Sequence, residues 1–425
     1  MAFKLLFPSA ATAVASASHR VPRSRTADND NATTGESTMG KAENLALPEI
    51  GSHALGTGKL PVEQYVSQEF FELEKEHIFR KSWLLAGRES DIKAPGDYQN
   101  FMVDAVGVSV VITRGKDQKL RAFYNACTHR GSRLVNAPTG NVRALVCNFH
   151  GWGFNLEGEL INVPDAGLFA DLDPKQEHLK PIHVDVWGGF IFINLAEKPE
   201  WTLREYLKPL DDKFDRYLGN KDWSWSFGWR AKFKANWKLI VDAQIEGYHV
   251  DMTHRKTIAG AIPGSSTAAY YFPESIGVPC GVAAYRPEDV SRGMQTPMNL
   301  LSAKYGATSI YTKPEREFVA EGGEGVLKED HPLWIFDNYL VFPNIVLFVQ
   351  KGQILIQRTI PLSADECIWE VDFYHTERPA NFGHAFNMEQ GVIQIRDVLS
   401  EDLYTAEGIH ANFKCGAITH VSLNK

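Results

Sequence analysis

Cysteine is scarce in this chain, with five residues in 425 and no Cys-x2-Cys pair among them. Such spacing gives no sign of a disulfide-stapled fold, and it fits a reducing compartment better than an oxidising one. A run of about 18 apolar residues, the length that a membrane-spanning helix requires, is also missing. The sequence therefore predicts no transmembrane segment.

An excess of positive charge is missing as well. The chain has 44 Lys and Arg residues against 52 Asp and Glu residues, which gives a formal net charge of −8. Because this balance provides no basic field, neither nucleic acid nor an anionic membrane is expected as a partner. The length leaves room for two domains, each with its own core.

The first 46 residues have little that would order them. They are rich in Ala, Ser and Thr and contain no acidic residue before Asp28, so residues 1–46 are expected to form a disordered or targeting tail. Lys4 to Ala17 weakly resembles a signal or transit peptide interrupted by Pro8, and Met39 is an alternative start. An untargeted tail predicts a cytoplasmic protein, a transit peptide predicts an organellar stroma or matrix, and a secretion signal is the third reading.

Ordered structure is predicted from Pro61 onward. The first part has apolar residues at helical spacing and then short runs typical of strands; the helix is expected over Val62–Trp83 and the strands over Asn100–Thr113, Leu120–Asn125, Val142–Cys147, Phe154–Ile161 and His183–Leu195. We expect a small all-β domain with an N-terminal helix over residues 47–197.

The second part mixes helical and strand patterns. Helices are predicted over Trp201–Leu218, from Trp237 onward and over Met388–Ala406, and strands over Trp223–Phe233, Tyr339–Gln350, Gln353–Ile360 and Ile368–Tyr374. Residues 260–335 are too rich in Gly and Pro to assign. An α+β domain with an antiparallel sheet is therefore expected over residues 198–425.

Two short Cys/His pairs lie close together in the all-β part. Cys127-Thr128-His129 is followed, after seventeen residues, by Cys147-Asn148-Phe149-His150. Two thiolates can hold one iron of a 2Fe-2S cluster while two imidazoles hold the other, which is the ligand set of a Rieske cluster. Gly131 and Gly151 follow the two pairs closely and would allow tight turns against the cluster.

Structural zinc is an alternative for the same four side chains. Zinc also takes two Cys and two His, although its sites more often show Cys-x2-Cys and His-x3-His pairings. The Rieske interpretation fits the alternating pairs better, and we predict it.

A second metal site is suggested by His249 and His254 in the helix expected from Trp237. On an ideal helix, at about 100° per residue, their side chains diverge by about 140°, so binding one ion requires the helix to break between them. Alone, such a pair is more often incidental. Here a cluster that moves single electrons needs an acceptor, and non-haem iron that activates O2 is typically held by two His and one carboxylate.

The carboxylate would have to come from elsewhere in the chain. The helix expected near the C-terminus offers Asp397, Glu401 and Asp402. Most acids on such a helix face water, and the residues alone do not choose among these three.

In these motifs the chain resembles the α (catalytic) subunit of Rieske non-haem iron aromatic-ring-hydroxylating oxygenases. The resemblance spans about residues 60–410 and rests on three matches in order: the two cluster loops, Asn236-Trp237-Lys238 to His254, and Glu401-Asp402 with Glu407 five residues on. It implies a Rieske domain packed on a helix-grip (Bet v 1-like) catalytic domain. It also implies that His249, His254 and Asp402 hold a mononuclear Fe(II).

The resemblance gives a further role to Glu246. At this position the family has an acid, usually Asp, that bridges a cluster histidine of one subunit to an iron histidine of the next, here His150 to His249. A carboxylate that orients imidazoles in this way would shorten the electron path between subunits. Asp242 lies on nearly the same helical stripe and is the runner-up, and a solvated helix acid is the plain alternative for Glu246.

The resemblance also implies partners and a reaction. As a terminal oxygenase, the chain would receive electrons derived from NAD(P)H through a reductase or ferredoxin, because no Gly-rich dinucleotide fingerprint follows a strand here. Its substrate would be O2 with an aromatic or other small organic compound, as in aromatic hydrocarbon catabolism. Dihydroxylation, monohydroxylation and oxidative demethylation use the same metals. A head-to-tail homotrimer is expected, with or without a small β subunit.

A rival from another class is a Rieske electron-transfer protein whose second domain only docks partners. It would carry the cluster without mononuclear iron and would consume no O2.

Overall fold

The computed structural model describes residues 58–422 except 209, 212–222, 260–261, 273–274, 286–296, 303, 306–333, 351–352 and 377. The tail predicted over residues 1–46 lies outside the described residues. A helix was also predicted over Trp201–Leu218. The structure describes its first part, which contains α5 (Leu203–Tyr206), while residues 212–218 lie outside the described residues.

Two short helices and a π-helical turn stand where one helix was predicted over Val62–Trp83. They are α3 (Glu63–Val66), α4 (Gln68–Glu74) and the turn Lys75–Phe79. The break falls at Ser67, which has an extended backbone and whose hydroxyl accepts a hydrogen bond from the Phe70 N–H at 3.1 Å. A serine that caps the next helix in this way ends the preceding one.

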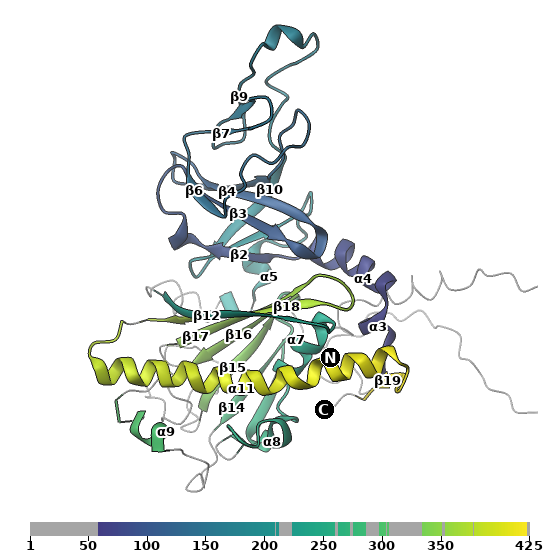
Figure 1. Cartoon of the computed structure of the whole chain (residues 1–425), viewed down its shortest axis with the longest axis vertical. Coiled ribbons are helices and arrows are strands. Elements are labelled where there is room, and N and C mark those ends of the chain that lie inside the picture. Colours follow the sequence, from purple (N-terminus) through teal and green to yellow (C-terminus); the bar gives the residue numbers. More distant parts are fainter. Residues whose placement is uncertain are drawn as a thin grey trace, which may run out of the picture.

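A seven-stranded antiparallel sheet forms the upper body of the molecule in Figure 1, in the order β2-β11-β10-β5-β4-β3-β6. Its strands are β2 (Leu84–Arg88), β3 (Asp97–Val103), β4 (Val108–Arg114), β5 (Leu120–Tyr124), β6 (Thr139–Asn141), β10 (Pro181–Trp187) and β11 (Phe190–Asn194). A three-stranded sheet toward the tip contains β7 (Leu145–Val146), β8 (Gly153–Phe154) and β9 (Leu160–Asn162). The predicted run Asn100–Thr113 is thus a hairpin of β3 and β4.

A second seven-stranded antiparallel sheet forms the lower body, in the order β12-β18-β17-β16-β15-β14-β13. Its strands are β12 (Ser224–Phe233), β13 (Thr267–Tyr271), β14 (Cys280–Tyr285), β15 (Trp334–Val341), β16 (Ile345–Gln350), β17 (Gln353–Pro361) and β18 (Cys367–His375). The single strand predicted over Tyr339–Gln350 is wrong, because the chain turns at Phe342-Pro343 between β15 and β16. Every residue of β16 is buried, so its apolar run does not alternate between apolar and polar residues. Without that alternation, the hydrophobic pattern does not separate β16 from β15.

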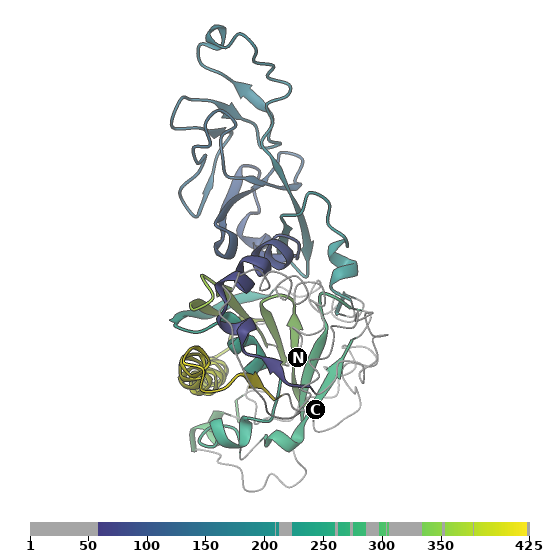
Figure 2. The ribbon, with the colours of Figure 1, turned by 90° about the vertical axis from the view of Figure 1, so that its right-hand side faces the viewer.

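One long helix lies along the second sheet. This helix, α11 (Phe382–Lys414), has 33 residues and contains the predicted span Met388–Ala406. It crosses the lower body in Figure 1 and is seen nearly end-on in Figure 2. The shorter helices are α7 (Trp237–Gln244), α8 (Val250–Thr253) and α9 (Pro297–Ser302). Near the two ends of the described chain, β1 (Leu60–Pro61) pairs with β19 (His420–Val421).

The predicted α+β architecture is confirmed: a β domain carries the Cys/His loops, and an antiparallel sheet grips a long helix. One hydrophobic cluster runs from the N-terminal helices through both large sheets, including Phe71, Phe192 and Leu355. In the part of the chain that the structure describes, no helix combines the length and apolarity that a membrane span needs.

Candidate functional site

The two Cys/His loops have the same construction. In each loop a glycine N–H donates to the carbonyl of the cysteine four residues earlier, at 2.8 Å for Gly131 to Cys127 and at 2.9 Å for Gly151 to Cys147. Both glycines have positive φ, +74° and +72°, a backbone conformation that residues with a Cβ rarely adopt. The tight glycine turns expected from the sequence are therefore present.

The four candidate ligands of the cluster lie together at the end of these loops. Both cysteines are buried, and the rings of His129 and His150 are 4.6 Å apart between centroids. His129 also stacks on Trp152, and its buried Nδ1 has no hydrogen-bond partner. Two buried thiols, two more exposed imidazoles and a ring nitrogen without a partner are the groups that would bind a Rieske cluster.

Asn125, which the sequence reasoning did not single out, ties the first cluster loop to its base. This buried amide accepts hydrogen bonds from the N–H groups of Leu134 and Val135 and donates one to the Val135 carbonyl at 2.7 Å. An asparagine next to a loop carries no pattern that would reveal such contacts, because the partners are set by how the loop closes.

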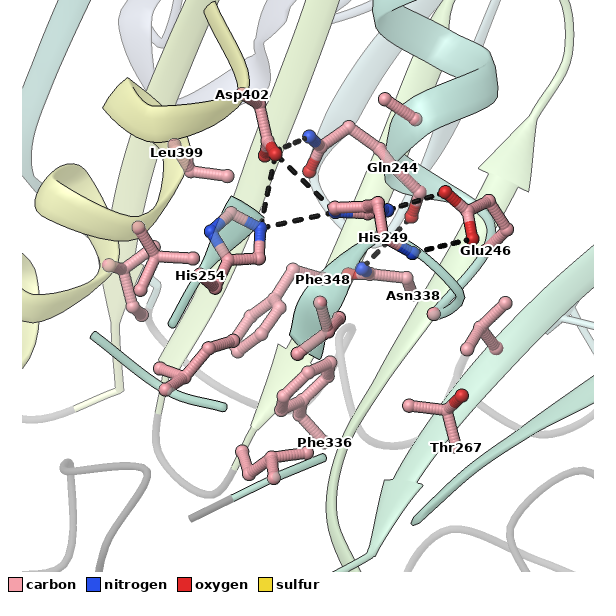
Figure 3. A pocket seen from close by; sticks show the side chains of 18 of the residues that line it. Gln244, Glu246, His249, His254, Thr267, Phe336, Asn338, Phe348, Leu399 and Asp402 are labelled. Carbon is pink, nitrogen blue, oxygen red and sulfur yellow. Dashed lines mark hydrogen bonds and ion pairs between the residues drawn. The ribbon is translucent and has the colours of Figure 1, made fainter. Parts of the chain in front are cut away.

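The second site brings His249, His254 and Asp402 together, as the resemblance implies. The Nε2 atoms of the two rings are 3.1 Å apart, and Oδ1 of Asp402 lies 3.4 Å from the first and 3.0 Å from the second (Figure 3). Ligands about 2.1 Å from one ion at neighbouring octahedral positions are about 3.0 Å apart. The three atoms thus match one face of an octahedron, the two-His-one-carboxylate arrangement of non-haem iron.

The local backbone differs from the prediction for this segment. The helix was expected to break between the two histidines, but α7 ends earlier, at Gln244, and the one-turn helix α8 separates His249 from His254. The rings therefore approach Asp402 from the two ends of a single turn.

Each of the three ligand side chains is held by a further polar group. Nδ1 of His249 lies 2.5 Å from Oε1 of Glu246, and Nδ1 of His254 lies 2.9 Å from Oε2 of Glu401. The second carboxylate oxygen of Asp402 accepts a hydrogen bond from Gln244 at 2.8 Å. Outer contacts of this kind fix the orientation of imidazole and carboxylate ligands and tune metal affinity.

The three acids that the sequence left open have distinct positions. Asp402 is buried in the triad, Glu401 orients His254 and also accepts from the Thr257 hydroxyl, and exposed Asp397 pairs with Arg396. Asp242, the runner-up for the bridge, accepts a hydrogen bond from the Tyr65 hydroxyl at 2.7 Å.

The charges of the triad are strongly linked. Burial disfavours the charged ring of His249, but hydrogen bonds and charges from Asp402 and Glu246 outweigh it and raise its pKa to about 9. The pKa of His254 is raised in the same way, against burial, by Asp402 and Glu401. Burial also opposes the charge of Asp402, yet its contacts with both rings hold its pKa below the usual value.

Metal binding at the triad is accordingly expected to depend on pH. Because both pKa values are raised, the metal-free rings tend to hold protons that an ion must displace, so affinity should fall by at least about tenfold per pH unit from pH 9 to pH 7. Anaerobic titration of the metal-free protein with Co(II) at pH 7, 8 and 9 measures this slope. Equal affinity at all three values would show that the rings are already neutral without metal.

A cavity of about 730 Å³, including its mouth, opens beside the triad. Its walls are mostly apolar and come from the second sheet, α8, the turn after α8, and α11; they include Ile258, Val282, Phe336, Phe348, Leu355 and Ile395. Four uncharged polar residues also line it: Gln244, Thr267, Asn338 and Gln357. A substrate in this cavity would lie beside a metal held by the triad.

Two family models match the chain in the order of these sites. Residues 82–172 match the Rieske [2Fe-2S] domain, and residues 214–423 match the ring hydroxylating alpha subunit (catalytic domain).

Known proteins with related sequence include two oxygenase components. The chain is 37% identical over 202 residues to the glycine betaine monooxygenase oxygenase subunit of Pseudomonas aeruginosa, covering 46% of this chain and 44% of that protein. It is 32% identical over 234 residues to the benzene 1,2-dioxygenase subunit alpha of Pseudomonas putida, covering 52% of this chain and 50% of that protein. The matched part thus spans about half the length of these curated relatives.

A solved structure with the same fold is that of a quaternary ammonium Rieske monooxygenase, described for carnitine oxidation by gut microbiota and inter-subunit electron transfer. The TM-score is 0.67 at 23% identity, over 86% of this chain and 88% of that one. This likeness establishes the fold over both sites.

Proposed function

The chain belongs to the Rieske non-haem iron oxygenases as a ring-hydroxylating-type α subunit, and we propose that it is the terminal oxygenase for a small N-methylated ammonium compound. The observation that carries the proposal is the pairing of two sites in one chain. The Cys/His loops can take up single electrons, and the triad faces a cavity with mostly apolar walls. A domain boundary near residues 197–198 separates the two sites.

The two sites would divide the chemistry between them. When bound, the cluster supplies one-electron transfer and the iron supplies O2 activation, so that a substrate C–H, O2, two electrons and two protons give a hydroxylated product and water. The chain's residues place the reactants. The cluster that accepts the electrons would be held by Cys127, Cys147 and the two loop imidazoles. The apolar cavity walls exclude water and place the substrate beside the triad.

The substrate class rests on the cavity and on the relatives. Phe336 and Phe348 line the cavity with ring centroids 4.7 Å apart, and aromatic faces bind quaternary ammonium groups through cation–π attraction. Glycine betaine and carnitine, which relatives of this chain oxidise, carry such a group. Oxygen insertion into an N-methyl C–H would give an unstable hydroxymethyl product and release formaldehyde. Ring hydroxylation of an aromatic substrate is the second candidate, favoured by the same phenylalanines and by the benzene dioxygenase relative.

We also propose that electrons cross between subunits of a head-to-tail trimer through Glu246. In Figures 1 and 2 the cluster loops lie at the opposite end of the molecule from α8, so one chain offers no short path. Glu246 contacts His249, and 29% of its side chain is exposed. This exposed part could contact His150 of a neighbouring copy. Phe149 beside His150 and Tyr248 beside His249 are also exposed, at 58% and 81%, and would meet in such an interface.

Replacing Glu246 by Gln tests the bridge. We expect single-turnover electron delivery between the metals to slow about 10- to 100-fold in protein reloaded with excess iron, with cluster absorption unchanged, because Gln keeps the shape but loses the charge that orients His249. Asp242→Asn is the matched comparison at the runner-up position. An unchanged rate in E246Q together with a slow D242N would move the bridge to Asp242.

The oxygenase function itself is tested by substrate-dependent O2 uptake with a reductase present. Methylated ammonium compounds should stimulate uptake and release formaldehyde, whereas aromatic compounds should give ring-hydroxylated products if the second candidate holds. An electron-transfer protein would consume no O2 with any of them, and that result would overturn both candidates.

A further inference from the structure

Two amide side chains interrupt the apolar floor of the cavity. Asn338 on β15 is paired with Phe348 on β16, which is paired in turn with Leu355 on β17. Gln357 lies two residues beyond Leu355 and therefore on the same face of the sheet. Both amides line the cavity, and Figure 3 shows Asn338 between the triad and Phe336.

Both amides have hydrogen-bonding capacity that the protein does not use. Gln357 is only 2% exposed, and its Oε1 is buried without a hydrogen-bond partner. Asn338 donates to the Gln244 carbonyl at 3.2 Å, but its Oδ1 is also buried and unpartnered. Buried polar groups are almost always paired in native proteins, so two orphaned oxygens beside one cavity indicate a ligand that completes them.

The charge around the cavity restricts the ligand group. Among the described residues that line it there is no Lys or Arg, and the charged ones are the carboxylates Glu246 and Asp402 and the two histidines that contact them. An anionic head beside Gln357 would leave water without gaining a Lys or Arg partner. An amide offers both an acceptor and donors, so its best neutral partner is a group that does the same, a hydroxyl or a carboxamide.

Resting on the proposed function, we propose that Gln357 and Asn338 recognise a neutral hydroxyl or carboxamide group on the substrate and select against a carboxylate. The apolar walls and the two phenylalanines hold the body of the molecule, and the two amides fix its polar end. This preference sets the chain apart from relatives named for glycine betaine and carnitine, which carry a carboxylate. A site built to hydrogen-bond a substrate group discriminates strongly against analogues that lack it.

The test compares three trimethylammonium compounds that share a two-carbon linker and differ in the terminal group: carbamoylethyl-, carboxyethyl- and butyl-trimethylammonium. Binding to the iron-loaded holoenzyme is measured by calorimetry, and KM and kcat are measured separately by formaldehyde release. We expect the carboxamide to bind at least about tenfold tighter than the carboxylate or the butyl compound. In Gln357→Leu its affinity should fall about 10- to 100-fold, with the butyl compound unaffected.

Gln353→Leu is the matched control. Gln353 is on the same strand, is fully buried and has both side-chain polar atoms unpartnered, but it is not among the residues that line the cavity. It should leave the order of the three compounds unchanged. Tightest binding of the carboxylate, or an unchanged preference in Q357L, would overturn the assignment and indicate that a buried water satisfies Gln357.

The same three terminal groups on a benzene ring separate this inference from the proposed function. If benzamide binds better than benzoate and ethylbenzene, and no trimethylammonium compound binds, the ammonium substrate class is wrong while the role of Gln357 stands. Failure of both series to bind would overturn both proposals.

Discussion

Replacing Asp402 by Ala is expected to remove the mononuclear iron and abolish oxygenation while leaving the cluster intact. Asp402 contributes the only carboxylate of the triad, and its Oδ1 lies within 3.4 Å of both imidazole Nε2 atoms. Two neutral imidazoles alone leave the ion without a balancing charge. Because removing even an outer contact typically costs 10- to 100-fold in metal affinity, we expect a loss of at least about 100-fold here.

The measurement is total iron per chain together with visible absorption. Iron should fall from about three atoms, two in the cluster and one at the triad, to about two, with the cluster spectrum unchanged. Asp397→Ala is the control, since Asp397 is on the same helix but exposed and paired with Arg396. Retention of all the iron in D402A would refute the ligand assignment.

The largest expected effect on stability comes from Lys238→Met. Lys238 is 1% exposed and its Nζ lies 2.5 Å from Oε1 of Glu74, which is 2% exposed and also accepts from the Trp237 indole N–H at 3.1 Å. The ammonium group lies 5.4–5.7 Å from the ring centroids of Tyr65, Phe70 and Trp237. This buried pair fastens α4 to α7, the helix that leads into the triad.

Removing the lysine leaves the Glu74 charge buried without its partner, so unfolding should become easier by about 3–5 kcal/mol. The double variant Glu74→Leu with Lys238→Met should recover most of the loss, because it removes both charges. Lys75→Met, which breaks the exposed pair with Glu72, should cost less than about 1 kcal/mol. Urea unfolding followed by tryptophan fluorescence compares the three, and equal stability of K238M and K75M would contradict the account.

The parts of the site that depend on short local motifs could be predicted from the sequence. The two Cys/His loops and their glycines are short motifs whose geometry is set within a few residues, and the structure has both turns as expected. The choice of Asp402 came from the family resemblance. Composition and periodicity could not separate it from Asp397 and Glu401, because which of the three acids is buried depends on how α11 packs.

Other features were out of reach for the same reason. Gln244, Glu401 and Gln357 owe their roles to neighbours far away in the chain, and a polar residue in a helix or strand reveals no such partner. The helix that begins at Trp237 ends at Gln244, whereas we expected it to continue to the segment between His249 and His254. No proline marks the break in this segment. Buried strands such as β16 lack the alternation that would have shown where each one begins.

We propose that electrons entering at the Cys/His loops reach a triad-bound iron and are used to insert oxygen into a substrate. The most direct test is a single turnover of the chemically reduced holoenzyme with isotopically labelled O2 and a trimethylammonium substrate, without a reductase. We expect oxidation of the cluster together with formaldehyde that carries labelled oxygen when it is trapped before it exchanges with water. We expect no product from D402A. Oxidation of the cluster without any labelled product in the wild type would contradict it.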